Sequence, residues 1–236
     1  MHNVLFDHSD GECIKRAALR TEGAADISGI DAAGWRRLCC SFGPASGDLC
    51  NSLPRVARRL CTEKLDPTVV ETYVASRLVG FDKCPGVRPI GISETVRRIV
   101  GKAIMTVLNP YVAASTGPVQ LCAGLQASCE AGVHALRALF ANSDTEAVLL
   151  VDASNAFNSL NRRVTLLNTP VVCPPLTTLL LNTYRLPGRL VTASGETLLS
   201  REGTTQGDPV AMAMYAVGIV PLIHRLADTG SQQVCG

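Results

Sequence analysis

The chain has 236 residues, 47% of them hydrophobic and 18% charged, so it can bury a real core, and extended disorder is excluded. Aromatic residues make up only 4%, so Leu, Val, Ile and Ala must fill that core. The uncharged run Pro209–Ile223 contains two prolines and is shorter than the roughly 20 apolar residues of a membrane-spanning helix. With no signal-peptide pattern at its start, we expect an intracellular protein, cytoplasmic or nuclear, without a membrane partner.

Charge is distributed unevenly along the chain. The net charge is only +2, yet Cys50–Pro110 carries ten Lys or Arg against five Asp or Glu, a local charge of +5. Such a segment suits a phosphate-rich partner, although on charge alone a solvated helix face is the more common explanation. The ten cysteines have irregular spacing, no CxxC pair and no histidine at zinc-ligand spacing, which favours reduced, mostly buried thiols.

The first 50 residues give few structural signals. Asp31–Cys40 has the pattern of a short helix with Trp35 on its apolar side, and the Gly-, Pro- and Ser-rich stretch Phe42–Asp48 predicts a linker. Helical spacing of apolar residues then begins in Leu53–Leu65.

Two extended runs and a long helix are predicted next. Thr72–Gly80 and Val87–Ile92 flank a turn with Pro and Gly, which predicts a hairpin. Ser93 is the expected N-cap of a helix that ends at Pro110. The face of this helix opposite its apolar side holds Arg97, Arg98 and Lys102.

The second half of the chain combines helices, one buried strand and a second hairpin. Apolar periodicity predicts helices over Glu130–Asn142, Leu176–Leu186 and Val210–Ala227, a buried strand over Ala147–Val151, and a hairpin formed by Arg189–Ala193 and Thr197–Ser200.

The first candidate for chemistry is the acid that follows the expected buried strand. Asp152 stands where that strand becomes a loop, a position from which a carboxylate points into a cleft. A carboxylate there suits Mg²⁺, which accepts one or two carboxylates together with substrate phosphates. Asp152 could equally cap the following turn, with Asn155 and Asn158 as further turn formers.

Two further features accompany this acid. Phe157, five residues later, would lie beneath whatever the metal-bound phosphates carry, or it simply fills the core. Gly203–Pro209 is a turn-rich loop whose glycines let the backbone approach a ligand, and Gln206 offers both a donor and an acceptor. The alternative is a tight strand-to-helix connection with Asp208 as N-cap.

Taken in order, four segments resemble the reverse transcriptases of retroelements, in particular LINE-type and group II intron enzymes. They are Val87–Ile92 with the helix to Lys102, Pro118–Gly124 with the helix at His134, Val148–Asn158, and Gly203–Pro209 with its helix. The resemblance covers residues 72 to 228. It implies an α+β, helix-rich fold with two hairpins and a truncated palm sheet.

The resemblance also implies a division of the chain and a reaction. Residues 1–50 stay undetermined, residues 51–145 form a fingers-like region, and residues 146–236 form a partial palm. The parent reaction is RNA-templated DNA synthesis by two-metal nucleotidyl transfer, with an RNA template, a DNA primer and a deoxynucleoside triphosphate as partners and Mg²⁺ as cofactor.

Residue roles follow from the same resemblance. Asp152 would be the catalytic ligand of the Mg²⁺ ions, and Phe157 would be the steric gate that rejects a 2′-hydroxyl. Gln206 and Gly207 would line the floor beneath the incoming nucleotide.

Three basic residues are the remaining candidates for nucleotide binding. Arg88 would contact the triphosphate, since a planar and permanently charged guanidinium suits phosphate. Lys83 and Lys102 are further candidates for phosphate or template backbone.

One element of the family pattern is missing from this sequence. The third palm motif has a Tyr-x-Asp-Asp-like tip, and no Asp-Asp pair occurs in this chain. We therefore expect a fragment that is inactive alone, because one carboxylate does not hold two divalent ions. A non-catalytic nucleic-acid-binding remnant and an RNA-dependent RNA polymerase-like palm are the alternatives, and Phe157 argues against the second. Element class, template and oligomeric state stay open.

Overall fold

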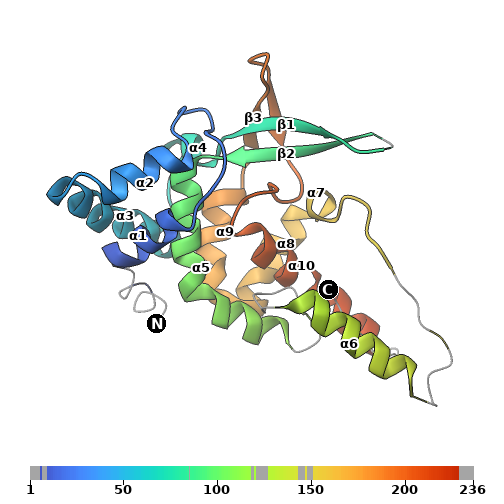
Figure 1. The fold of residues 1–236 in the computed structure, drawn as a ribbon. Helices are drawn as coiled ribbons and strands as arrows, with labels where there is room; N and C mark the ends of the chain where they lie inside the picture. The colour runs from blue at the N-terminus through green and yellow to red at the C-terminus, as the bar shows by residue number, and fades with distance from the viewer. Residues whose placement is uncertain are drawn as a thin grey trace.

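The structure is a computed structural model that describes residue 6 and residues 10–84, 86–117, 120, 127–142, 147 and 151–228. Within these residues the fold is α+β: helices predominate, and one small four-stranded sheet lies along one edge of the molecule (Figure 1). The α+β class expected from the sequence is therefore confirmed.

Four helices occupy the N-terminal part of the chain: α1 (Gly11–Leu19), α2 (Ala32–Cys40), α3 (Pro44–Thr62) and α4 (Pro67–Val74). Aspartates precede three of them, and each accepts a hydrogen bond from a first-turn amide at 2.7–2.8 Å: Asp10, Asp31 and Asp66. The predicted helix over Asp31–Cys40 is confirmed, with Trp35 packed against the core.

The predicted linker at Phe42–Asp48 is wrong from Pro44 onward, because α3 begins there. Proline is well tolerated in the first turn of a helix, where its missing N–H has no partner to lose. The Ser46 hydroxyl donates to the carbonyl of Leu38 at 2.6 Å and so ties the start of α3 to α2. Ser46, which in the sequence favoured a linker, thus forms a contact between two helices.

Both predicted hairpins form, and they belong to one sheet. Strands β1 (Ser76–Asp82) and β2 (Val87–Ser93) are antiparallel, as are β3 (Gly188–Val191) and β4 (Thr197–Ser200). The strand order is β2-β1-β3-β4, with β1 and β3 parallel. The first strand starts later than predicted, because residues 72–74 are the last turn of α4.

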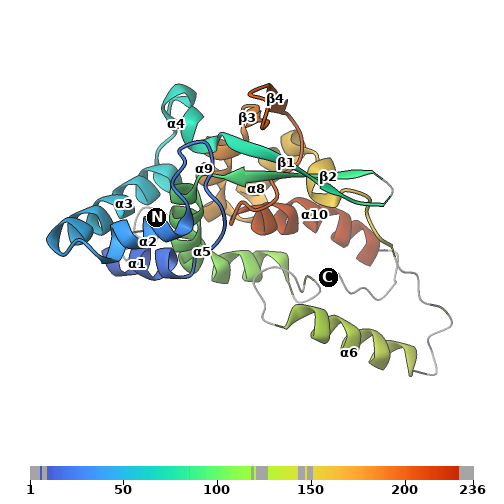
Figure 2. The same ribbon diagram turned by 45° about the horizontal axis from the view of Figure 1, so that its top comes forward.

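The long helix α5 (Thr95–Thr116) runs through the middle of the molecule (Figures 1 and 2). It continues past Pro110, where the sequence predicted its end, and its N-cap is Glu94 in place of Ser93. The later helices are α6 (Ser128–Phe140), α7 (Ala156–Ser159), α8 (Arg162–Val172), the 3₁₀ helix η2 (Pro174–Leu176), α9 (Thr177–Tyr184) and α10 (Ala211–Ala227). Figure 2 shows α6 set apart from the other helices.

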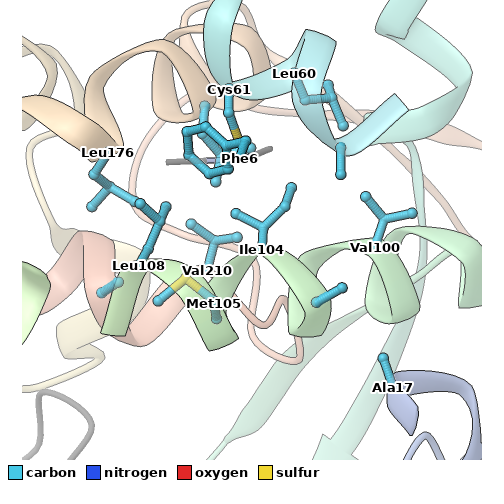
Figure 3. Close-up of a cluster of buried hydrophobic side chains, with 14 of the residues drawn as sticks. Phe6, Ala17, Leu60, Cys61, Val100, Ile104, Met105, Leu108, Leu176 and Val210 are labelled. Carbon is cyan, nitrogen blue, oxygen red and sulfur yellow. The ribbon is translucent and has the colours of Figure 1, made fainter. Parts of the chain in front are cut away.

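The core is built almost entirely of aliphatic side chains, as the low aromatic content requires. Ile104 and Leu108 of α5 face Leu60 of α3 and Leu176 of η2, and Phe6 is inserted among them (Figure 3). The same buried cluster includes residues of α1, α9 and α10. One continuous core thus joins elements from all three regions into which the sequence was divided.

The buried strand expected over residues 147–151 falls mainly on residues 148–150, which lie outside the described part of the chain. Its two described ends, Ala147 and Val151, are exposed and in no strand. Val151 has 83% of its surface exposed, so the expectation of burial directly before Asp152 is wrong.

The segment between α1 and α2 is tied to the start of α5 and β1 by two carboxylates. Asp26 accepts a hydrogen bond from the backbone N–H of Arg77 at 2.6 Å. Glu94 accepts from the N–H of Ser28 at 2.8 Å and from its hydroxyl at 2.7 Å. Burial raises the pKa of Asp26 to about 6, despite the Arg77 amide that opposes the shift.

The sequence predicted mostly buried, reduced cysteines and no membrane-spanning helix. Of the seven cysteines whose side chains are described, five are buried free thiols, while Cys40 and Cys84 are exposed. None of the helices in the described ranges has the length and apolarity to cross a bilayer.

Candidate functional site

The centre of the candidate site is the loop Gly203–Pro209 that leads into α10. Its first residues are held by the segment around α7, since the N–H of Gly203 donates to Leu160 O at 2.9 Å and the N–H of Thr204 donates to Phe157 O at 2.7 Å. Gly203 has a φ of 66°, and a Cβ there would lie 2.5 Å from the backbone of Asn158. Only glycine fits this position, because both the left-handed conformation and the contact exclude a side chain.

The other side of the loop lies against β2. A Cβ on Gly91 would come within 2.5 Å of the Thr205 methyl group, and a Cβ on Gly207 would lie 3.4 Å from Gly91 O. Gly207 has a φ of 93°. Two glycines therefore let the loop and the strand approach each other closely. Three of the four segments that carry the resemblance meet here: β2, the residues around Phe157, and this loop.

Beneath the loop, Asp208 forms a buried ion pair with Arg97 of α5. Only 3% of the Arg97 side chain and 1% of the Asp208 side chain are exposed. The Tyr184 hydroxyl donates to the same carboxylate at 2.6 Å, and the N–H of Val210 donates to its other oxygen at 3.1 Å. Arg97 also donates to Val74 O at 2.9 Å. This carboxylate therefore joins the loop to α5 and α9 as well as capping the entry to α10.

Burial and their contacts with one another determine the protonation states of Arg97 and Tyr184. Burial is the largest single influence and disfavours the charged form of Arg97, but Asp208, Tyr184 and Tyr73 together outweigh it, so the pKa of Arg97 is raised. Burial first, and Asp208 second, raise the pKa of Tyr184. Arg97 thus stays cationic and Tyr184 stays a neutral donor, which is the state that the hydrogen bonds require.

A second buried arginine fixes the chain just before the loop. Arg162, the first residue of α8, donates to Ser200 O at 2.8 Å, to Glu202 O at 2.9 Å and to Gly203 O at 3.0 Å. Its guanidinium carbon lies 5.3 Å from the ring centre of Tyr184, within cation–π range. Arg162 therefore satisfies the carbonyl groups of a turn that regular secondary structure leaves unpaired.

The backbone of Phe157 contacts the loop that carries Gln206 and Gly207, whereas its ring packs against α10. Phe157 is partly buried, and its ring centre lies 4.9 Å from that of Tyr215 on α10. Gln206 is partly buried and Gly207 is exposed on the same loop. Asp152 lies in the exposed chain that precedes α7.

The three basic candidates lie in different places. Arg88 is exposed on β2 opposite Phe81, and Lys83 is exposed in the adjoining turn. Lys102 is on α5, where its ammonium group donates to Arg20 O at the end of α1 at 2.9 Å. Arg88 and Lys83 thus share the hairpin tip, whereas Lys102 contacts the N-terminal helix.

The cationic face predicted for the helix that begins near Ser93 is engaged with the protein itself. Arg97 is buried in the ion pair, and Arg98 donates to Glu22 O at 2.6 Å and to Ala24 O at 2.7 Å. The expectation of a solvated or nucleic-acid-binding face is wrong for Arg97. Its partner lies 111 residues further along the chain, so no local pattern could reveal it.

The described residues do not form a two-metal centre. No group of three or more His, Cys, Asp or Glu side chains with the geometry to hold an ion occurs among them. Asp152 alone could offer carboxylate oxygens to one Mg²⁺ ion, and two-metal transfer needs further carboxylates close to it. The residues of the described chain therefore do not fit the pair of ions.

Sequence reasoning missed three residues that shape this site. Asp208 was considered only as a helix cap, while Arg162 and Tyr184 were not considered at all. An arginine directly after an N-cap residue, Asn161, and a tyrosine at the end of an apolar helix carry no signal of their own.

Comparison with models of known protein families, and with curated proteins, found no match to this chain.

Proposed function

We propose that this chain supplies the fingers and part of the palm of a retroelement reverse transcriptase, an enzyme that copies RNA into DNA by two-metal nucleotidyl transfer. The observation that carries the proposal is the packing of the Gly203–Pro209 loop between β2 and the residues around Phe157. These segments are more than 40 residues apart in the sequence, and the resemblance requires them to form one nucleotide site.

The roles proposed for single residues follow that arrangement. Phe157 excludes the 2′-hydroxyl of a ribonucleotide, and Gln206 and Gly207 form the floor beneath the incoming base and sugar. Arg88 binds the triphosphate. Asp152 contributes one Mg²⁺ ligand, and when bound the ions activate the primer hydroxyl and support the leaving pyrophosphate.

We further propose that this chain alone does not catalyse the reaction, because the described residues form no group of three or more His, Cys, Asp or Glu side chains that could hold the ions. The test is primer extension on an RNA template with deoxynucleotides and Mg²⁺, comparing the wild type with Asp152→Ala. We expect no extension from either. Extension that requires Mg²⁺ and disappears in Asp152→Ala would show that the proposed inactivity is wrong.

Nucleic-acid binding without catalysis is the second candidate, and the two exposed cations at the hairpin tip favour it. An RNA–DNA duplex whose backbone contacts Arg88 and Lys83 should bind with a steep salt dependence. The double variant Arg88→Gln/Lys83→Gln should reduce the slope of log K against log salt by about 2, one for each lost phosphate contact.

The matched control removes one arginine and one lysine from the same basic segment at a distance from the hairpin. Arg55 and Lys64 are exposed, and α3 lies on the opposite side of the molecule from the hairpin tip (Figure 1). Arg55→Gln/Lys64→Gln should leave the slope unchanged in a fluorescence anisotropy titration. Equal effects of the two double variants would point to a general charge effect and refute a binding site at the hairpin.

A further inference from the structure

A cavity of about 590 Å³ lies between α1, α5 and the start of α10. Its volume falls within the range of ligand pockets in proteins, roughly 300–1,000 Å³. It is lined by residues of three helices that are distant in the sequence, so it is a feature of the packed fold. No role in the proposed reverse transcriptase uses it.

Three of the residues that line this cavity are positively charged. Arg16 and Arg20 come from α1 and its C-cap, and Lys102 comes from α5. Of the described residues that line the cavity, none is acidic. Glu22 lies near Lys102 and opposes the effect of Arg98 on its pKa, but Glu22 is not part of the lining.

The cations are available to a ligand. Arg16 and Arg20 are exposed, and within the described chain neither forms an ion pair with an acidic side chain. Lys102 is held in place by its hydrogen bond to Arg20 O. Arg16, in the last turn of α1, also complements the dipole of that helix. The helix dipole of α1 does not explain why Lys102 of α5 lines the same cavity.

The rest of the lining is mainly apolar. Met105 and Val112 of α5 and Ala213 of α10 are 8%, 2% and 3% exposed, and Met212 of α10 is 44% exposed. Methionine adapts its shape to irregular apolar partners, so a lining with two methionines can accommodate rings or chains of different outline.

We propose that this cavity binds a small amphipathic anion, whose acidic group contacts Arg16, Arg20 and Lys102 while its apolar part covers Met105 and Met212. Charge complementarity selects the acidic group, because three cations face the cavity with no acid among them. Burial of apolar surface on the methionine side provides the remaining affinity. The inference does not rest on the reverse transcriptase proposal: Lys102 is a nucleotide-binding candidate that also lines the cavity, but the proposed nucleotide site gives it no role.

The probe for this site is 8-anilinonaphthalene-1-sulfonate, with the uncharged N-phenyl-1-naphthylamine as its matched counterpart. The two dyes share the same rings, and only the first carries an anion. We expect the sulfonate to bind the full chain saturably at one site per molecule, in a fluorescence titration, and more tightly than the neutral dye.

Two variants test the charged and the apolar contacts of the site, and both change exposed residues. Arg16→Gln/Arg20→Gln should weaken sulfonate binding at least about tenfold and leave the neutral dye unaffected, because it removes two charged donors to the sulfonate and none to the neutral dye. Thr106→Trp, at an exposed lining position, should block both dyes by filling the cavity. Circular dichroism checks that each variant is folded.

The control is Arg37→Gln/Arg55→Gln, which removes two exposed arginines elsewhere and should leave binding within twofold of the wild type. The proposal is overturned if the sulfonate binds both test variants as tightly as the wild type, since the dye then lies on other apolar surface. It is also overturned if the two dyes bind equally well. Displacement of the sulfonate by a single-stranded oligonucleotide, lost in Arg16→Gln/Arg20→Gln, would instead assign the cations to nucleic acid and overturn it.

Discussion

The buried ion pair beneath the Gly203–Pro209 loop leads to a quantitative prediction. Asp208→Asn keeps the shape of the side chain and removes its charge, so Arg97 is left cationic in a site where only 3% of its side chain reaches solvent. Removing one partner of a buried pair costs about 3–5 kcal/mol, because the remaining charge has no compensation. This is a large part of the roughly 5–15 kcal/mol that stabilises a typical domain.

The assay is urea unfolding followed by circular dichroism, with an exposed ion pair as control. Arg189 and Glu71 are 2.7 Å apart, with 57% and 49% of their side chains exposed. Glu71→Gln should therefore cost less than about 1 kcal/mol. A loss for Asp208→Asn no larger than that for Glu71→Gln would refute the reasoning that the pair is desolvated.

A double variant separates the lost ion pair from a general loss of packing. Arg97→Met/Asp208→Asn removes the uncompensated charge, so it should cost less than the sum of the two single changes by about 2 kcal/mol or more. Additive costs would mean that the two side chains do not interact. The comparison remains informative if Asp208→Asn alone is too unstable to purify, because the double variant should then be the more stable protein.

Two further predictions concern a glycine of the site and a buried acid. Gly203→Ala should lower the free energy of unfolding by about 3 kcal/mol or more, since the added Cβ would lie 2.5 Å from backbone atoms. Gly195 has a φ of 86° but open space around it, so Gly195→Ala should lower it by only about 1 kcal/mol. Equal losses for the two variants in urea unfolding would contradict the close contact at Gly203. Because the pKa of Asp26 is raised to about 6 in the folded state, the folded protein binds this proton more tightly than the unfolded chain, and stability should fall as pH rises from about 4 to 6. The free energy of unfolding of Asp26→Asn relative to the wild type should therefore increase by up to about 3 kcal/mol between pH 4 and pH 7, and a pH-independent difference would show that the carboxyl is not perturbed.

Local signals were sufficient for most of the elements. The turn residues between Thr72 and Ile92, and the Ser194-Gly195 turn, correctly predicted both hairpins, because left-handed backbone at a tight turn depends on a few neighbouring residues. Errors arose where a local signal had two meanings. Pro44 and Pro110 were taken as breaks, yet the first begins α3 and the second lies inside α5.

Contacts between distant segments could not be predicted in the same way. Neither the parallel pairing of β1 with β3 nor the insertion of Phe6 into the core has a signature in its own stretch of sequence. The resemblance placed Phe157 and Gln206 in one site, but it did not identify what supports that site. The supporting residues are two buried arginines, and arginine in sequence most often indicates an exposed position.

The two arginines explain why a loop with three polar residues in a row can be held in one conformation. Arg162 donates hydrogen bonds to the carbonyl groups of Ser200, Glu202 and Gly203, and Arg97 holds the carboxylate of Asp208 at the other end. Between these two anchors the side chain of Gln206 forms no hydrogen bond or ion pair with the described residues and remains partly exposed. A rigid backbone that presents an uncommitted amide is what a binding site needs, because the ligand then does not have to order the loop. The same physical argument links the stability predictions to the proposed function: a substitution that releases either anchor should weaken nucleotide binding even where the chain remains folded.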